Sequence, residues 1–274
     1  MEIKERFKER GKDVAVMLHI NMGLTIYILA LAAISGAVFG SFINCIAWRM
    51  ANDKSIWKGR SHCPSCGHIL SALDLIPIVS YVAMNGKCRY CKAAVSIRYV
   101  ATELFMAFVF VALVCKYDIS FMTLRYLVLA CILLALSLVD IDRYEIPNSL
   151  IGFGVIWWVI TVLLMDAPIQ TQVIQGLIGG VAIGGGVLLL SLIMDVVLKK
   201  ESMGGGDIKL FFMLGLYMGP MLGLFHLVVS CLFGIVLVLV LKKNRIPFGP
   251  AMSLAALFVW LWGDEILAWY FSLF

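Results

Sequence analysis

Charged residues are scarce in this chain, and their scarcity excludes an ordinary soluble domain. Only 14% of the 274 residues are charged, whereas 62% are hydrophobic. A typical soluble domain is about half apolar and about a quarter charged. We also expect no separate signal peptide, because the first 20 residues are charged and the first apolar run is too long for a signal-peptide core. The composition therefore predicts a polytopic membrane protein.

Long uncharged runs take the place of the missing charge. A membrane-spanning helix needs about 20 mostly apolar residues. We therefore expect an all-α fold with about eight transmembrane helices. They are predicted near residues 22–46, 101–116, 121–140, 149–165, 173–197, 208–219, 221–241 and 249–270. Residues 1–21 form a charged tail in this scheme, and residues 47–100 form the one sizeable polar domain, ahead of a membrane domain of residues 101–274.

Lysine and arginine gather in alternate connections, and this asymmetry orients the predicted helices. They lie between the first two spans and after the third, fifth and seventh spans, so an eight-span arrangement places them on one side, taken as cytoplasmic. The tail disagrees, because Lys4, Arg6, Lys8, Arg10 and Lys12 fall on the opposite side. Acidic residues among them dilute this conflict without removing it.

Two cysteine pairs lie in the polar domain. Cys63 and Cys66 form one C-x-x-C unit, and Cys88 and Cys91 form the next. Such units let two turns offer two thiolates each to a tetrahedral zinc ion. Disulfides are the alternative, but they suit an oxidising compartment and not the cytoplasmic side. Between the pairs, residues 69–84 are apolar but too short to span, and we expect them to pack on the zinc module and the membrane surface.

Aspartates occur at two edges of the apolar runs. Asp207 follows Gly204 and Gly206 at the start of an uncharged run, and Asp140 and Asp142 close an earlier one shortly before Pro147. Carboxylates at such positions suggest function by default. An N-capping role for Asp207 and simple solvation of the other two are the plainer alternatives. Both motifs fall on the cytoplasmic side.

Two carboxylates within hydrogen-bonding distance cannot both ionise easily, so they share a proton. The ionised one can accept a proton from water while the other polarises a peptide carbonyl, as in aspartic proteases. We therefore expect Asp207 to face Asp140 or Asp142 as an acid/base pair.

These motifs together resemble the bacterial type IV prepilin peptidases, which are GxGD aspartyl proteases and N-methyltransferases. The matching pieces occur in the family's order: residues 40–44, 63–66, 76–81, 86–91, 97–99 with Glu103, 140–147, 204–210 and 247–250. The resemblance implies that Asp140 and Asp207 are catalytic, supported by Gly204, Gly206 and Asp142. Met50 and Val100 depart from it, because the family often has proline at these positions.

The resemblance also implies two reactions at a bacterial inner membrane. The enzyme would remove a leader from prepilins or pseudopilins after a glycine, facing the cytoplasm, and then methylate the new N-terminal amine with S-adenosylmethionine. Structural zinc would bind the four cysteines, and Asn44, Arg98 and Glu103 are candidate substrate or cofactor contacts. Prepilins and lipid are the expected partners, and nucleic acid is not. The loop lacks a Rossmann glycine fingerprint, so the sequence does not locate the cofactor.

Two other functions fit the intramembrane acids less fully. A proton-coupled transporter or channel with a regulatory zinc module would also use aspartates. Transporters often consist of internally repeated halves, however, and the sequence shows no repeat. A structural scaffold bound through the zinc module would leave Asp140 and Asp207 without a purpose.

Overall fold

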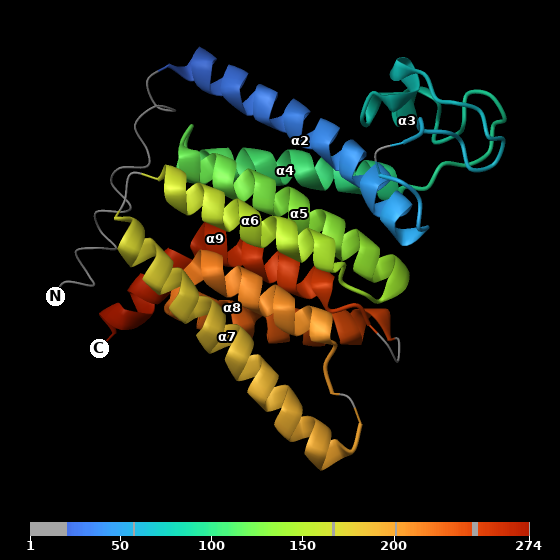
Figure 1. Cartoon of the computed structure of the whole chain (residues 1–274). Coiled ribbons are helices and arrows are strands. Elements are labelled where there is room, and N and C mark those ends of the chain that lie inside the picture. The colour runs from blue at the N-terminus through green and yellow to red at the C-terminus, as the bar shows by residue number, and fades with distance from the viewer. Residues whose placement is uncertain (1–20, 57, 166–167, 201, 243–245, 274) are drawn as a thin grey trace. The chain divides into compact units, whose positions relative to one another are not determined.

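The computed structural model describes residues 21–56, 58–165, 168–200, 202–242 and 246–273. The described chain forms two compact units, residues 21–123 and residues 124–273, and each is taken here by itself. The predicted tail, with its basic residues, lies outside the described residues. Helices are the main regular elements of the described residues, and residues 52–97 form a largely irregular connection among them, which confirms the predicted all-α membrane fold (Figure 1).

Two long helices form the base of the first unit. Helix α2 spans Met22–Ala51 and helix α4 spans Arg98–Tyr117. They pack closely where α2 carries glycine, because a methyl group added at Gly40 would lie 2.9 Å from the carbonyl oxygen of Thr102. Small residues permit such approach between membrane helices. The polar connection, residues 52–97, therefore leaves and returns at the same end of the helix pair.

Only short elements interrupt this connection. A 3-10 helix, η1, spans Ala72–Leu75, and α3 spans Val79–Ala83. Both are far too short to cross a membrane, as expected for residues 69–84. Leu73, Val79 and Val82 are each at least 60% exposed. The contact of this stretch with the membrane surface stays a prediction.

The second unit is a helical bundle. It contains α5 (Phe121–Arg143, apart from its first three residues), α6 (Asn148–Leu164), α7 (Ile169–Leu198), α8 (Gly205–Leu241) and α9 (Gly249–Ser272). Leu133 and Leu136 of α5, Leu214 of α8, and Met252 of α9 are almost completely buried. Helix α5 stops where Tyr144 adopts a left-handed φ of 57°, three residues before Pro147.

Helix α8 folds back on itself at Gly219. This residue has φ 70° and ψ −176°, angles open essentially to glycine alone, and Pro220 follows it. The rings of Phe211 and His226 are only 5.7 Å apart, although 15 residues of straight helix would extend about 22 Å. The element therefore consists of two antiparallel arms, residues 205–218 and 220–241.

This turn reconciles the structure with the eight predicted spans. Among the described residues, six helices are long and apolar enough to cross a membrane, and α6 is a shorter apolar helix. Counting the arms of α8 separately yields eight passes. The first arm is about 21 Å long, shorter than a hydrocarbon core of about 30 Å. The predicted span of residues 208–219 was short in the same way.

Candidate active site

Asp140 lies in the last turn of α5, and its side chain is buried, with 5% of its surface exposed. One carboxylate oxygen, Oδ2, accepts a 2.8 Å hydrogen bond from the backbone N–H of Gly249, the first residue of α9. A methyl group at Gly249 would lie 2.8 Å from the same oxygen. The start of α9 therefore holds the Asp140 carboxylate in one orientation.

Asp207 lies in the first turn of α8 and is half-buried. Its backbone N–H donates to the Gly204 carbonyl over 3.0 Å, so the helix begins at the glycine run. The carboxylate lies against Gly204, where an added methyl group would stand 3.1 Å from Oδ2. Because Gly204 has no side chain, it leaves space beside the Asp207 carboxylate.

Contacts between the two loops bring these acids together. A methyl group at Gly206 would lie 2.9 Å from Cβ of Ile146 in the loop after α5. The Lys209 ammonium donates to the Asn148 side-chain oxygen over 2.8 Å. The start of α8 therefore packs directly on the α5–α6 connection, and the carboxylate of Asp140 interacts electrostatically with that of Asp207.

Asp142 lies two residues further along α5, and its side chain is exposed. A helix turns by about 200° over two residues, so Asp140 and Asp142 point in different directions. Only Asp140 is enclosed by the bundle.

The Gly249 amide is a feature of the site that sequence reasoning missed. Residues 247–250 were one of the pieces that carry the family resemblance, but nothing in them signals that an N–H would contact Asp140. The available clue was the run Pro247-Phe-Gly-Pro250, because proline has no N–H and the amides of Phe248 and Gly249 are then the donors within it at the helix start.

The four cysteine sulfurs of the first unit form a compact cluster. Those of Cys63, Cys66, Cys88 and Cys91 all lie within 4.8 Å of one another, and the Cys63–Cys91 separation is 3.8 Å. Four thiolates arranged tetrahedrally around zinc at about 2.3 Å are themselves about 3.8 Å apart. The spacing of these sulfurs therefore fits a tetrahedral metal ion.

The two cysteine pairs sit in matching backbone turns. The N–H of Cys63 donates to the His68 carbonyl, and the N–H of Gly67 donates back to Cys63. The second turn repeats this pattern, from Cys88 to Ala93 and from Lys92 to Cys88. Gly67 and Lys92 occupy the same left-handed position, with φ values of 71° and 61°. Two copies of one turn thus present two sulfurs each.

Backbone donors and crowding affect these thiols in opposite ways. N–H groups of Cys66 and Ser65 lower the pKa of the Cys63 thiol to about 6. Although an N–H of Ala93 acts in the same direction, loss of solvent and the neighbouring sulfurs raise the pKa of the Cys91 thiol to about 11. Several thiolates at this spacing need a cation to stabilise them, which again fits a bound metal.

The remaining predicted contacts all lie in the first unit. Asn44 is buried, and its side-chain amide donates to the Thr102 hydroxyl and the Gly40 carbonyl, so it joins α2 to α4. Glu103 is also buried and accepts a 2.7 Å hydrogen bond from the backbone N–H of Ile78. Arg98 begins α4 and is partly exposed.

Comparisons with known proteins identify the relatives of this chain. Residues 34–117 match the bacterial peptidase A24 N-terminal domain, and residues 127–239 match the type IV leader peptidase family. A prepilin leader peptidase/N-methyltransferase of Aeromonas hydrophila is 30% identical, over 95% of this chain and 100% of its own length. One of Bacillus subtilis is 31% identical, over 89% and 98%. No solved structure matches. This chain therefore belongs to the type IV leader peptidase family, and it is a polytopic membrane enzyme.

Proposed function

We propose that this enzyme removes the leader from type IV prepilins or pseudopilins, with Asp140 and Asp207 as the catalytic pair. One observation carries the proposal: the buried Asp140 carboxylate, oriented by the Gly249 amide, lies at the end of the bundle where the start of α8, which carries Asp207, packs on the α5–α6 connection. Family membership and the relatives named as prepilin leader peptidases support this substrate class.

The pair would work by sharing one proton. The ionised carboxylate takes a proton from water as the water oxygen bonds to the peptide carbonyl carbon, and the protonated carboxyl hydrogen-bonds to the carbonyl oxygen. Collapse of the tetrahedral intermediate breaks the C–N bond, and the leaving nitrogen receives a proton from the pair. The leader ends as a carboxylate and the mature pilin begins with a free amine.

The position of the pair suggests how the substrate arrives. Both aspartates lie at helix ends on the side that the basic connections mark as cytoplasmic. The substrate's peptide bond must leave its helix before cleavage, since helical amides are paired internally. Cleavage after glycine suits this requirement, because glycine is a poor helix former.

The first unit would serve the second reaction, methylation of the new amine. Cys63, Cys66, Cys88 and Cys91 would hold a structural zinc ion, as their spacing allows. S-adenosylmethionine supplies an electrophilic methyl group when bound. The substrate nitrogen would receive this methyl group, with S-adenosylhomocysteine as the leaving group and the amine proton released to water. The names of the relatives support this activity.

Leader removal tests the catalytic pair directly. The purified enzyme is incubated with a prepilin, and the products are followed by mass spectrometry. Asp140→Asn and Asp207→Asn should each lower kcat/KM at least about 1,000-fold, within the range of general acid–base catalysis. Asp142→Asn is the matched control, because its side chain is exposed, and it should change the rate by less than about threefold.

Each outcome assigns a role. Processing at a normal rate by Asp140→Asn or Asp207→Asn would refute the pair, and loss of processing in Asp142→Asn alone would transfer the first role to Asp142. A gain of one methyl group on the mature product would establish methyl transfer. Family membership favours a peptidase over the proton-coupled transporter or channel with which the intramembrane acids alone were compatible.

A further inference from the structure

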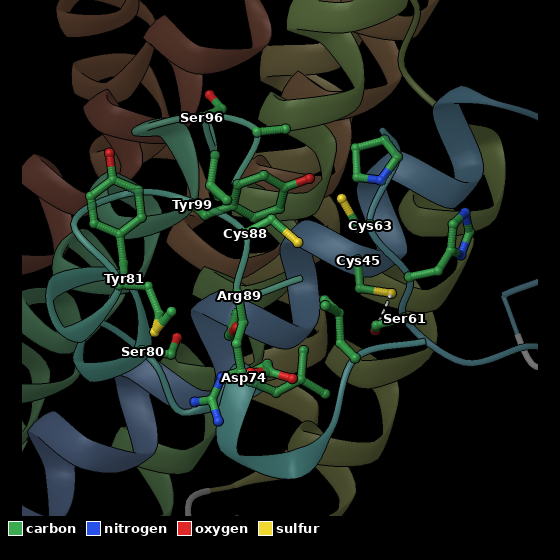
Figure 2. Close-up of a pocket in the computed structure, with 18 of the residues that line it drawn as sticks. Cys45, Ser61, Cys63, Asp74, Ser80, Tyr81, Cys88, Arg89, Ser96 and Tyr99 are labelled. Atoms are coloured by element: carbon green, nitrogen blue, oxygen red, sulfur yellow. Dashed lines mark hydrogen bonds and ion pairs between the residues drawn. The ribbon is translucent and has the colours of Figure 1, made fainter. Parts of the chain in front are cut away.

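The first unit contains a cavity of about 410 Å³ beside the cysteine cluster. Three segments line it: the inner end of α2, the cysteine turns with residues 70–96, and the start of α4. Figure 2 shows Cys45 of α2, Cys63 and Cys88 of the turns, and Tyr99 of α4 around this space. Small-molecule sites typically occupy about 300–1,000 Å³, so the cavity has the size of a ligand site.

Glu103 lines this cavity with hydrogen-bonding capacity to spare. Its side chain is 6% exposed, and its Oε2 accepts from the Ile78 N–H. Within the described part of the chain, no donor reaches its other oxygen, Oε1. Oε1 therefore has capacity to accept a hydrogen bond from a group in the cavity that Glu103 lines. A hydroxyl or ammonium group of a ligand in the cavity would satisfy it.

The backbone at Ile78 adds a second sign of a built site. Ile78 has φ 62° and ψ −51°, which is strained for a β-branched residue. Strain of this kind gathers at ligand sites and persists only where neighbouring structure imposes it. Ile78 is not itself in the lining, but its N–H donates to Glu103, which is.

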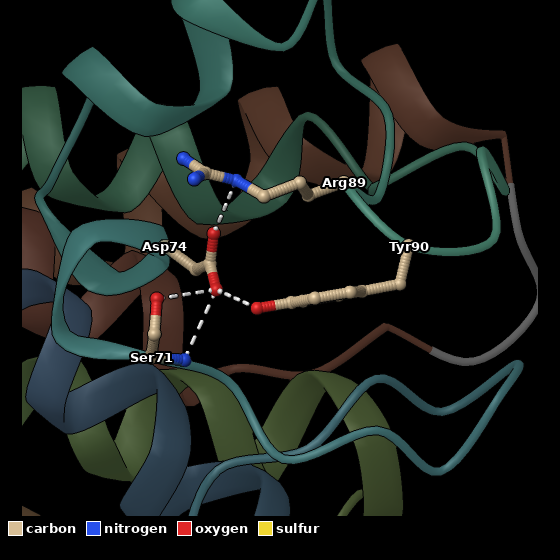
Figure 3. A network of polar contacts seen from close by, with 4 residues as sticks. All are labelled: Ser71, Asp74, Arg89 and Tyr90. Carbon is tan, nitrogen blue, oxygen red and sulfur yellow. Dashed lines mark hydrogen bonds and ion pairs between the residues drawn. The ribbon is translucent and has the colours of Figure 1, made fainter.

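Asp74, the other acid in the lining, has no such spare capacity. Its Oδ2 accepts from the backbone N–H and hydroxyl of Ser71 and from the Tyr90 hydroxyl, at 2.7 to 3.1 Å. Its Oδ1 pairs with Nε of Arg89 at 2.9 Å (Figure 3). These bonds, with that of Ser71 first, lower the pKa of Asp74. Asp74 therefore organises the module, and Glu103 is the acid available to a ligand.

The rest of the lining is mixed in character. Trp48, Tyr81 and Tyr99 contribute aromatic rings, and Arg60 and Lys87 contribute positive charge. Neither of these two cations forms an ion pair within the described residues. A ligand that contains a planar base together with hydroxyl, ammonium and carboxylate groups matches this lining. The aromatic rings can stack on the base, and the two cations can attract the carboxylate.

We infer that this cavity binds S-adenosylmethionine and that Glu103 accepts hydrogen bonds from its ribose hydroxyls or its ammonium group. This inference rests on the proposed methyl transfer. Glu103 is not assigned to the sulfonium, because a carboxylate there would stabilise the charge that is lost in the transition state and so oppose the reaction. Glu103 is thus a binding residue for the methyl donor.

Binding to the full-length enzyme, measured by titration calorimetry, tests the inference. Glu103→Gln keeps an oxygen to accept from Ile78 but removes the charge, and we expect it to raise the Kd of S-adenosylmethionine about tenfold or more. S-adenosylhomocysteine, whose sulfur is neutral, should lose affinity by the same factor. Adenosine should bind Glu103→Gln more weakly than the wild type only if Glu103 binds the ribose. Asp53→Asn, an exposed acid outside the cavity, is the matched control.

A second variant tests the cavity independently, in case Glu103→Gln fails to fold. Ser80→Trp places a large ring in the cavity wall and should abolish donor binding, whereas Val82→Trp, which is exposed and outside the lining, should not. Metal content verifies that each variant is folded. Normal affinity in both Glu103→Gln and Ser80→Trp, with methylation intact in the wild type, would overturn the inference. A wild type that neither binds the donor nor methylates would instead refute the proposed methyl transfer, and the inference with it.

Discussion

At the scale of single residues, contact distances separate two neighbouring glycines at the proposed active site. An added methyl group at Gly206 would lie 2.9 Å from Cβ of Ile146, whereas at Gly205 it would meet nothing within 4 Å among the described residues. Position 206 therefore needs glycine so that the start of α8 can pack on the loop after α5, whereas position 205 does not.

We therefore predict that Gly206→Ala damages leader cleavage and Gly205→Ala does not. Overpacking of this kind costs about 1–3 kcal/mol, and moving a catalytic group by about 1 Å can cost about 100-fold in rate. Gly206→Ala should lower kcat/KM at least about tenfold in the prepilin assay. Equal activity of the two variants would mean that the packing on Ile146 does not position Asp207.

At the scale of elements, the turn inside α8 depends on Gly219. Its φ of 70° with ψ of −176° belongs to a region essentially restricted to glycine. We predict that Gly219→Ala destabilises the protein by about 1–3 kcal/mol and lowers its melting temperature in detergent. Gly186→Ala in α7, where an added methyl group has open space, is the control. An unchanged melting temperature for Gly219→Ala would contradict the fold-back.

The cysteine turns are the second element with a testable role. Each turn supplies two sulfurs, so the loss of one ligand leaves an incomplete metal site. We predict that Cys88→Ser lowers the bound zinc to less than about a tenth of wild type, and that residues 52–97 become protease-sensitive, because small metal domains fold on their metal. Elemental analysis and limited proteolysis measure these effects. Full zinc occupancy in this variant would exclude the four-thiolate site.

At the scale of the whole molecule, the fold-back of α8 determines the number of membrane passes. With two arms in α8 the count is eight, and Asn21 and Leu273 would lie on the same side of the membrane, whereas a straight α8 would make seven passes and place them on opposite sides. We predict that reporters fused after Ser120 and after Ser272 are both active outside the cytoplasm, and that a reporter after Lys200 is active inside. A cytoplasmic signal after Ser272 alone would exclude the hairpin.

The sequence by itself determined the features that depend on consecutive residues. Long apolar runs predicted the membrane class and the helices, because hydropathy acts along one segment at a time. The break before Pro220 was visible because glycine followed by proline interrupts a helix locally. The spacing of the cysteine pairs predicted a cluster because each C-x-x-C turn positions its own two sulfurs.

Only the tertiary structure decided the features that depend on how helices pack and rotate. It buried Asp140 and left Asp142 exposed, it aimed the Gly249 amide at the Asp140 carboxylate, and it left one oxygen of Glu103 beside a cavity. These contacts join residues up to 109 positions apart. A linear pattern does not contain them, because the rotation of each helix about its axis is set by side-chain packing against its neighbours.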